Sequence, residues 1–286
     1  MIVFPNAKIN LGLRITRRRP DGYHDIESLM VPVKWCDVLE AVPAAGGAHS
    51  LTVTGRGVAV EPEANLVMKA VRALERRTGA PLPPLDIYLR KIIPDGAGMG
   101  GGSADASFML RVADKVCALG LSDDELASVA SEIGADCPFF IYNNVVSATG
   151  TGTTITPARE AEEALRALSL TIVIAKPGEG VSTREAYAGV TPAPLAGMTP
   201  AEIVALLPPE EWEAAGLVND FEASVMSRRP SIAAAKATMT ALGAAYAAMT
   251  GSGSAVFGLF RDGGDNLADT VREAFAGCDT MVSPLL

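Results

Sequence analysis

The sequence predicts a globular protein that mixes helices and strands, of the α/β or α+β class. Short runs of strand-like residues alternate with helical patterns along the 286 residues. Hydrophobic residues make up 49% of the chain and charged residues 20%, which is enough for a sizeable core and excludes wholesale disorder. A chain of this length corresponds to about two domains or to one large domain.

The first elements surround a glycine-rich segment. Residues 9–15 alternate apolar and polar side chains, as in a half-buried strand. Residues 86–93 are predicted to form a second strand, which Pro94 ends. Apolar residues at three- and four-residue spacing then predict a helix over about 103–119. The glycines therefore lie between a strand and the N-terminus of a helix.

The middle of the chain contains a helix, a junction and a strand. Ser122 and Glu125 have the spacing of a capping box, which predicts a helix through residue 133. Residues 149–163 are rich in turn residues and then in charges, so we expect the domain junction there. Residues 170–175 are uniformly apolar or β-branched and are predicted to form a strand.

The C-terminal part alternates helices and strands again. Residues 182–185 and 199–202 have capping-box patterns, and each predicts a helix start. An alanine-rich stretch predicts a long helix over about 231–248. A strand over 255–260 and a helix over about 266–275 follow.

Charge and cysteine content exclude several classes of protein. The 24 basic and 33 acidic residues give a net charge of −9, which argues against nucleic acid as the main partner but leaves room for a small phosphate ligand. The four cysteines are widely spaced and the chain has two histidines, so disulfide frameworks, zinc ribbons and histidine-rich metal sites are not expected. We find no pattern of a signal peptide or a membrane span and expect a cytoplasmic protein.

The segment 94–103 carries the strongest functional signal. Five of the seven residues 96–102 are glycine, so a ligand can approach the backbone closely. Before a helix N-terminus, such a loop presents N–H groups and the positive end of the helix dipole to an anion. The G-x-G-x-x-G pattern at Gly96, Gly98 and Gly101 is met, but no acidic ribose partner follows about 20 residues later. The Walker pattern also fails, because Gly102 stands where its lysine would be. A flexible turn is the alternative interpretation.

Taken together, five segments resemble the GHMP kinases, the small-molecule kinases that include galactokinase, homoserine kinase and mevalonate kinase. The segments are residues 5–11, 19–24, 94–104, 134–140 and 250–257. The D-G-Y-H and G-A-D-x-P motifs resemble one branch in particular, whose members phosphorylate the 2-hydroxyl of a cytidine-diphosphate-linked sugar alcohol in the non-mevalonate route to isoprenoid precursors.

The resemblance implies an α+β protein with the GHMP kinase fold. Residues 1–155 would form a domain like the second domain of ribosomal protein S5, which binds ATP, and residues 156–286 a ferredoxin-like domain. The implied cofactors are ATP and Mg²⁺, and the implied partner is a small molecule with a cytidine diphosphate group. We expect no nucleic acid, no membrane, and a monomer or weak homodimer.

Two catalytic residues follow from the resemblance. Asp136 matches the aspartate that accepts the proton of the attacking hydroxyl, and Lys8 matches a lysine beside it that keeps the carboxylate ionised and steadies the transferred group. From the residues alone, Asp136 could equally be a helix-end residue, and Lys8 a solvated lysine at a strand edge.

The substrate-binding residues form a second implied set. Tyr23 and His24 match a pair that holds cytosine, one by ring stacking and one by hydrogen bonds, and Tyr187 matches an aromatic residue on the opposite side of the base. Asn10 lies two residues from Lys8 on one strand face and is expected to bind the sugar alcohol. Thr183 is expected to do likewise. A buried tyrosine and a surface histidine are the alternative.

The implied nucleotide-binding residues centre on the glycine loop. Asn65 and Lys91 match positions beside the base and ribose, and the turn 251–254 would support the loop, although it could be a plain connection. Ser103 would provide a hydroxyl for phosphate or Mg²⁺. The loop residues themselves are Pro94, Asp95, Gly96, Ala97, Gly98, Met99, Gly100, Gly101, Gly102, Ser103 and Ala104.

Two loop residues depart from the family pattern. Ala104 replaces the second of two serines that many relatives carry, and Asp95 places a carboxylate at a phosphate loop, where it either points away or helps to hold the metal.

Two other functions remain open at this stage. A GHMP kinase that acts on a different alcohol would have no use for Tyr23, His24 and Tyr187. A nucleotide- or RNA-binding module would not need Lys8 and Asp136, and the net charge of −9 argues against RNA.

Overall fold

The computed structural model describes residues 1–56, 60–261, 263–264 and 266–286, and its chain divides into two compact units. The first unit comprises Met1–Ala7, Trp35–Asp95 and Gly100–Asn144; the second comprises Lys8–Lys34, Gly96–Met99 and Val145–Leu286. The two units alternate along the chain, because two 13-residue strands, β2 (Asn6–Arg18) and β3 (His24–Cys36), have most of their residues in the second unit. The division at residue 155 stays a prediction.

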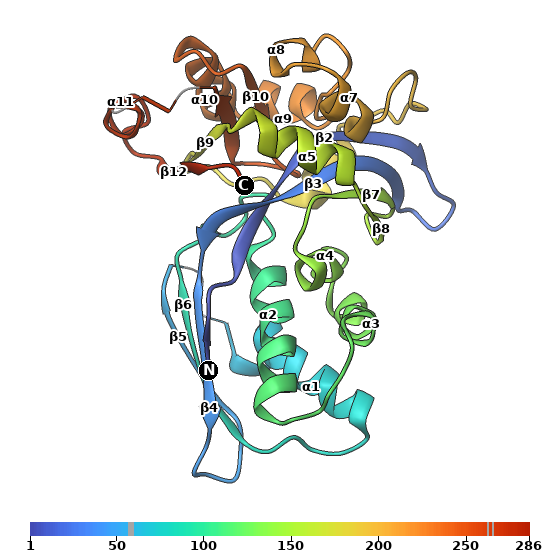
Figure 1. The fold of residues 1–286 in the computed structure, drawn as a ribbon, viewed down its shortest axis with the longest axis vertical. Coiled ribbons are helices and arrows are strands. Elements are labelled where there is room, and N and C mark those ends of the chain that lie inside the picture. The colour runs from blue at the N-terminus through green and yellow to red at the C-terminus, as the bar shows by residue number, and fades with distance from the viewer. Residues whose placement is uncertain (57–59, 262, 265) are drawn as a thin grey trace. The chain divides into compact units, whose positions relative to one another are not determined.

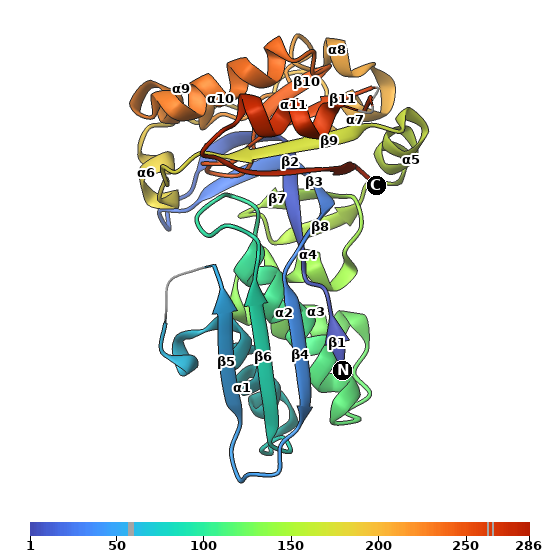
Figure 2. The same cartoon turned by 90° about the vertical axis from the view of Figure 1, so that its left-hand side faces the viewer.

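The first unit contains a four-stranded sheet with helices on one face (Figures 1 and 2). The strand order is β1-β4-β6-β5, and β5 runs parallel to β6 while the other pairs are antiparallel. The strands are β1 (Ile2–Val3), β4 (Val38–Pro43), β5 (Ser50–Gly55) and β6 (Leu85–Lys91).

Four helices and a 3₁₀ turn complete the first unit. They are η1 (Pro62–Ala64), α1 (Leu66–Thr78), α2 (Gly101–Val116), α3 (Asp123–Ile133) and α4 (Cys137–Tyr142). The Asn65 side chain caps α1, and Gly79 ends it in the left-handed conformation. The capping box predicted at Ser122 is confirmed, with Glu125 as its reciprocal partner.

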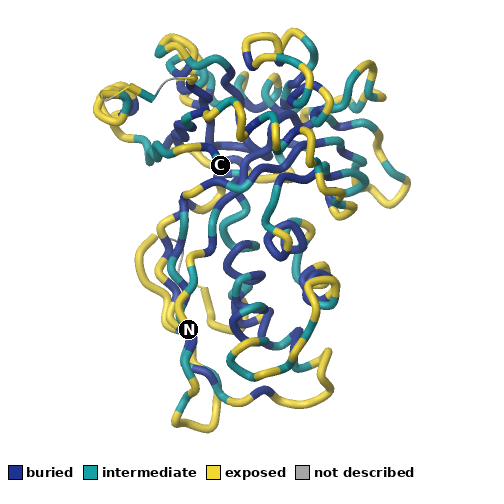
Figure 3. The backbone as a smooth tube through the Cα atoms, in the orientation of Figure 1, coloured by how far each residue is buried: buried dark blue, intermediate teal, exposed yellow. Residues whose placement is uncertain are grey.

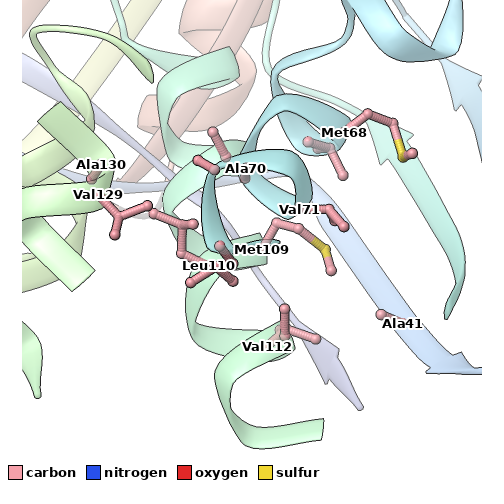
Figure 4. Close-up of a cluster of buried hydrophobic side chains, with 14 of the residues drawn as sticks. Ala41, Met68, Ala70, Val71, Met109, Leu110, Val112, Val129 and Ala130 are labelled. Carbon is pink, nitrogen blue, oxygen red and sulfur yellow. The ribbon is translucent and has the colours of Figure 1, made fainter. Parts of the chain in front are cut away.

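The helices of the first unit share one hydrophobic core with the sheet. Side chains from α1, α2, α3 and β4 interdigitate there, and Figure 4 shows them converging. The labelled members are Ala41, Met68, Ala70, Val71, Met109, Leu110, Val112, Val129 and Ala130. This core holds α2 from Ala106 onward, and the N-terminus of that helix carries one end of the glycine loop.

The second unit contains two antiparallel four-stranded sheets. One has the order β2-β3-β7-β8, with β7 (Val146–Gly150) and β8 (Thr154–Pro157) as a hairpin. The other has the order β10-β11-β9-β12, and its strands β10 and β11 are buried along their whole length (Figure 3). Its members are β9 (Thr171–Lys176), β10 (Tyr246–Met249), β11 (Val256–Phe260) and β12 (Asp279–Pro284).

Helices connect the strands of the second unit. They are α5 (Arg159–Leu168), α6 (Thr183–Ala188), α7 (Pro200–Leu206), α8 (Pro209–Trp212), α9 (Glu222–Arg228), α10 (Pro230–Ala241) and α11 (Leu267–Ala274). The capping box predicted at Thr199 is confirmed, and the Ser182 hydroxyl accepts the Glu185 amide at the start of α6.

One sequence prediction is wrong in this unit. The predicted helix 231–248 stops at Ala241, because Tyr246–Met249 pairs with β11 as a buried strand, and burial in the sheet outweighs the helix propensity of alanine. The segment 149–163 includes the end of β7, all of β8 and the start of α5, and the domain junction expected there stays a prediction. Among the described residues, no helix is both long and apolar enough to cross a membrane.

Candidate active site

The middle of the glycine loop is held through its carbonyl groups. The amides of Ser254 and Ala255 donate to the carbonyls of Gly96 and Ala97 at 3.3 and 3.2 Å, and the Lys8 amide donates to the Met99 carbonyl at 3.0 Å. The turn that includes residues 251–254 therefore supports the loop, as predicted.

The loop amides are arranged differently from its carbonyls. None of the N–H groups of residues 96–100 donates a hydrogen bond to any residue that the structure describes. They are followed by the first N–H groups of α2, which a helix leaves without intrahelical partners. A run of amides of this kind, with tethered carbonyls, is suited to bind an anion.

Gly98 lies at a position that only glycine can occupy without strain. Its φ is +72°, and a β-carbon there would lie 2.2 Å from the carbonyl oxygen of Thr250. The Thr250 hydroxyl, which is buried, donates to the Gly98 carbonyl at 3.3 Å and accepts the Asn10 amide at 3.1 Å. The loop, the β10 end and β2 are thus joined through one threonine.

Lys8 and Asn10 form a buried pair on β2. The Lys8 ammonium donates to Asn10 Oδ1 at 2.6 Å, which confirms that the two side chains share a strand face. Asn10 Nδ2 donates to Ser28 Oγ at 2.8 Å, and that hydroxyl donates to the Gly12 carbonyl at 2.6 Å. The sequence did not indicate Ser28. This chain of hydrogen bonds fixes the Asn10 amide and, through it, the Lys8 ammonium.

Asp136 lies in the first unit, at the N-terminal end of α4. It follows the end of α3 at Gly134, and its own side chain does not cap α4. The Ser107 hydroxyl of α2 donates to the Cys137 carbonyl at 2.8 Å, and a β-carbon on Gly134 would lie 4.0 Å from Ser103 Oγ. The first two turns of α2, with Ser103, therefore lie beside the segment that carries Asp136. Lys8 belongs to the second unit, so its pairing with Asp136 stays a prediction.

The first unit has a cavity of about 510 Å³ beside the start of α2. It is lined by four of the predicted nucleotide-binding positions: Asn65, Lys91, Asp95 and Gly102. Its walls combine apolar side chains with a few polar groups, as expected for a nucleobase site. The lining residues are Leu51, Val53, Thr54, Gly55, Arg56, Val60, Pro62, Ala64, Asn65, Leu66, Leu89, Lys91, Asp95, Gly102 and Asp105. The sequence signals for the apolar wall are the alternation of Leu51 and Val53 and the strand predicted over 86–93, which contains Leu89.

Lys91 has two partners that the sequence did not indicate. Its ammonium is bound by the carboxylates of Asp37 and, at 2.6 Å, of Asp105, and its residue is only 7% exposed. Burial disfavours the charge of Lys91, but the two carboxylates outweigh burial and raise its pKa. Neither aspartate belongs to a local pattern that sequence reasoning could have recognised.

The aromatic residues of the second unit form a stack. His24 lies on Tyr187 with ring centroids 4.8 Å apart and 19° between the planes, and Tyr187 meets Phe221 edge to face. A base does not fit between His24 and Tyr187, because a third ring would need roughly twice that centroid separation. Tyr23 is 68% exposed. Thr183 Oγ1 lies 3.3 Å from Ser252 Oγ.

Comparison with known proteins gives two family-model matches. Residues 65–144 match the GHMP kinases N terminal domain, and residues 209–277 match the GHMP kinases C terminal domain. The first match includes the glycine loop and α2, and the second includes the turn that holds the glycine loop.

Individual proteins show the same likeness over nearly the whole chain. The 4-diphosphocytidyl-2-C-methyl-D-erythritol kinase of Parabacteroides distasonis is 51% identical over 91% of this chain and 92% of that protein. The kinase of the same name from Porphyromonas gingivalis is 46% identical over 92% and 93%. A crystal structure of 4-(cytidine 5'-diphospho)-2C-methyl-D-erythritol kinase matches with a TM-score of 0.76 and 29% identity, over 99% and 98% of the two chains.

Proposed function

We propose a mechanism for this chain, which belongs to the GHMP kinases and, among them, to the 4-diphosphocytidyl-2-C-methyl-D-erythritol kinases. The reaction transfers the γ-phosphoryl group of ATP to the 2-hydroxyl of 4-diphosphocytidyl-2-C-methyl-D-erythritol, in the non-mevalonate route to isoprenoid precursors. The observation that carries the assignment of the ATP site is the run of loop amides from residue 96 to 100, which donate to no described residue while the carbonyls around them are tethered.

The glycine loop binds the ATP phosphates through these amides and the N-terminus of α2. The base lies in the cavity of the first unit, where Leu51, Val53 and Leu66 supply apolar walls. Asn65 Oδ1 is used to cap α1, so its Nδ2 is the group left to donate to the nucleotide.

Magnesium, when bound with ATP, neutralises phosphate charge. The chain offers oxygen donors of the type that this ion prefers, namely Ser103 Oγ at the start of α2 and the carboxylate of Asp95 at the cavity. Because Mg²⁺ bound to a nucleotide usually keeps several waters and takes few protein ligands, a dedicated cluster of carboxylates is not required.

Asp136 accepts the proton of the attacking hydroxyl, and the hydroxyl oxygen forms its bond to the γ-phosphorus as the bond to the ADP oxygen breaks. Lys8 places a positive charge beside this reaction, and the hydrogen bond to Asn10 holds its ammonium in place. Asn10 and Thr183 bind the sugar alcohol. The cytosine stacks on the ring of Tyr23, with His24 and Tyr187 on its other side.

A coupled assay of ADP release tests the substrate. The panel comprises 4-diphosphocytidyl-2-C-methyl-D-erythritol, the same alcohol without its cytidine diphosphate group, mevalonate and homoserine. We expect turnover of the first compound alone at substantial rates. Equal turnover of mevalonate or homoserine would reject the specific assignment.

Asp136→Asn tests the mechanism. We expect kcat to fall by roughly 10²–10⁴-fold with little change in KM, because a positioned base contributes that much and the amide still fills the space. Asp123→Asn, at an exposed aspartate of the same unit, is the matched control. An unchanged kcat in Asp136→Asn removes this residue from the catalytic role.

A further inference from the structure

Three buried charged side chains meet in the first unit, beside the glycine loop. Asp37 is 0% exposed, Asp105 2% and Lys91 7%. Asp37 lies between β3 and β4, Lys91 is the last residue of β6, and Asp105 lies one turn after the start of α2. The Lys91 ammonium donates to both carboxylates. Groups so strongly desolvated persist only when they are paired, so the three side chains act together.

Asp37 fixes the backbone that leads into the loop. Its Oδ1 accepts the amides of Ile92 and, at 2.8 Å, of Ile93, which are the two residues between β6 and Pro94. Its own amide donates to the Pro5 carbonyl at 2.8 Å. One carboxylate therefore binds the loop's incoming backbone through one oxygen and Lys91 through the other.

Lys91 and Asp105 connect the two sides of the loop. Lys91 ends the strand before the loop, and Asp105 belongs to the helix after it. Their 2.6 Å contact spans fourteen residues of sequence and is almost fully buried. Charge-assisted hydrogen bonds in such surroundings are shorter and more directional than neutral ones, so they fix a separation well.

The formal charges of the three side chains do not cancel. Two carboxylates and one ammonium sum formally to −1, and Asp105 Oδ1 is buried without a hydrogen-bond partner among the described residues. Burial and the neighbouring Asp37 raise the pKa of Asp105 to about 8, although Lys91 opposes them. A protonated Asp105 makes the cluster neutral and still accepts Lys91 through Oδ2.

We propose that Asp37, Lys91 and Asp105 form a positioning cluster that clamps the two ends of the glycine loop, so that its amides are held ready for phosphate. Lys91 then acts on the nucleotide through the loop, because its ammonium is already paired with the two aspartates. This inference rests on the proposed function insofar as the loop binds ATP, but the clamp itself is a property of the nucleotide-free protein.

The test measures how fast the backbone amides of the loop exchange hydrogen with solvent in the protein without nucleotide. Hydrogen exchange, followed by mass spectrometry on peptides that cover residues 90–101, reports the amides held by Asp37. In Lys91→Met we expect exchange there to be at least tenfold faster, with exchange in α1 unchanged. Lys69→Met, at an exposed lysine of α1, is the matched control and should leave both regions as in the parent.

Two substitutions of Asp105 separate clamping from general destabilisation. Asp105→Leu removes the acceptor and should resemble Lys91→Met. Asp105→Asn keeps an oxygen for Lys91 without a charge and should stay within about threefold of the parent at pH 7. If Asp105→Leu left the exchange of residues 90–101 unchanged, the clamp would be rejected.

Titration with a fluorescent ATP analogue completes the test. We expect the Kd of Lys91→Met to rise at least tenfold. A rise in Kd with unchanged exchange means that Lys91 contacts the nucleotide directly, which overturns the proposal. Failure of the parent protein to bind the analogue counts against the proposed function alone, because the exchange experiment uses no nucleotide.

Discussion

The middle of the glycine loop and its flanks are held by different kinds of interaction. The carbonyls of Gly96, Ala97 and Met99 accept main-chain hydrogen bonds from the amides of Ser254, Ala255 and Lys8. The Gly98 carbonyl accepts from the Thr250 hydroxyl. The flanks are held by buried side-chain charges, with Asp37 on the incoming backbone and Asp105 on α2. Main-chain contacts depend on steric fit and hardly on pH, whereas a buried cluster depends on its protonation state. One loop thus combines two anchors that respond to different perturbations.

Breaking the steric anchor should have the largest effect. Gly98→Ala places a methyl group 2.2 Å from the Thr250 carbonyl oxygen at a φ of +72°, so the loop must move. We expect kcat/KM for ATP to fall at least about 100-fold, which corresponds to about 2.7 kcal/mol.

Gly96→Ala is the matched control for Gly98→Ala. Its φ is +61°, but a β-carbon there meets nothing within 4 Å. The left-handed conformation alone costs roughly 1–2 kcal/mol, so kcat/KM should fall less than about thirtyfold. Equal falls in kcat/KM in Gly96→Ala and Gly98→Ala would show that backbone conformation, and not the close approach to Thr250, is what requires glycine at position 98.

The charged anchor should respond to pH. The pKa of Asp105 is raised from 3.8 to about 8, so the folded protein keeps a proton that the unfolded chain releases between these values. The folded state therefore binds more protons, and Asp105 lowers the stability as pH rises from about 4 to about 8. The slope from one such group is at most about 1.4 kcal/mol per pH unit.

Asp105→Asn removes this titration and leaves the other carboxylates in place. We expect the free energy of unfolding of Asp105→Asn, relative to the parent, to increase with pH between 5 and 8. Urea denaturation of both proteins at each pH unit measures the difference. Parallel curves would show that Asp105 is ionised in the folded protein throughout this range.

The same contrast explains what the sequence could predict. The glycine loop, the strand before it and the helix after it are local patterns, and so are the capping boxes at Ser122 and Thr199. Asp37 and Asp105 are 68 residues apart and acquire their role only because the fold brings both to Lys91. Strand β10 was mistaken for helix because alanine favours helix locally, while pairing with β11 is a tertiary effect. The cavity depends likewise on β5 lying beside β6.

Thr250→Val should give the smallest effect, at the steric anchor. The buried hydroxyl accepts the Asn10 amide at 3.1 Å and donates to the Gly98 carbonyl at 3.3 Å, so valine leaves that buried amide without an acceptor. The loss should destabilise the protein by about 1–2 kcal/mol. Because Ser254 and Ala255 still hold Gly96 and Ala97, the KM for ATP should rise less than about tenfold.

Thr240→Val, which removes an exposed hydroxyl that donates to the Lys236 carbonyl, controls for the change of residue type. Its free energy of unfolding should change by about 0.5 kcal/mol or less. If kcat/KM for ATP fell as much in Thr250→Val as in Gly98→Ala, the Thr250 hydroxyl, and not the run of main-chain contacts, would determine the position of the loop. The distinction between its middle and its flanks would then disappear, because both would depend on single side chains.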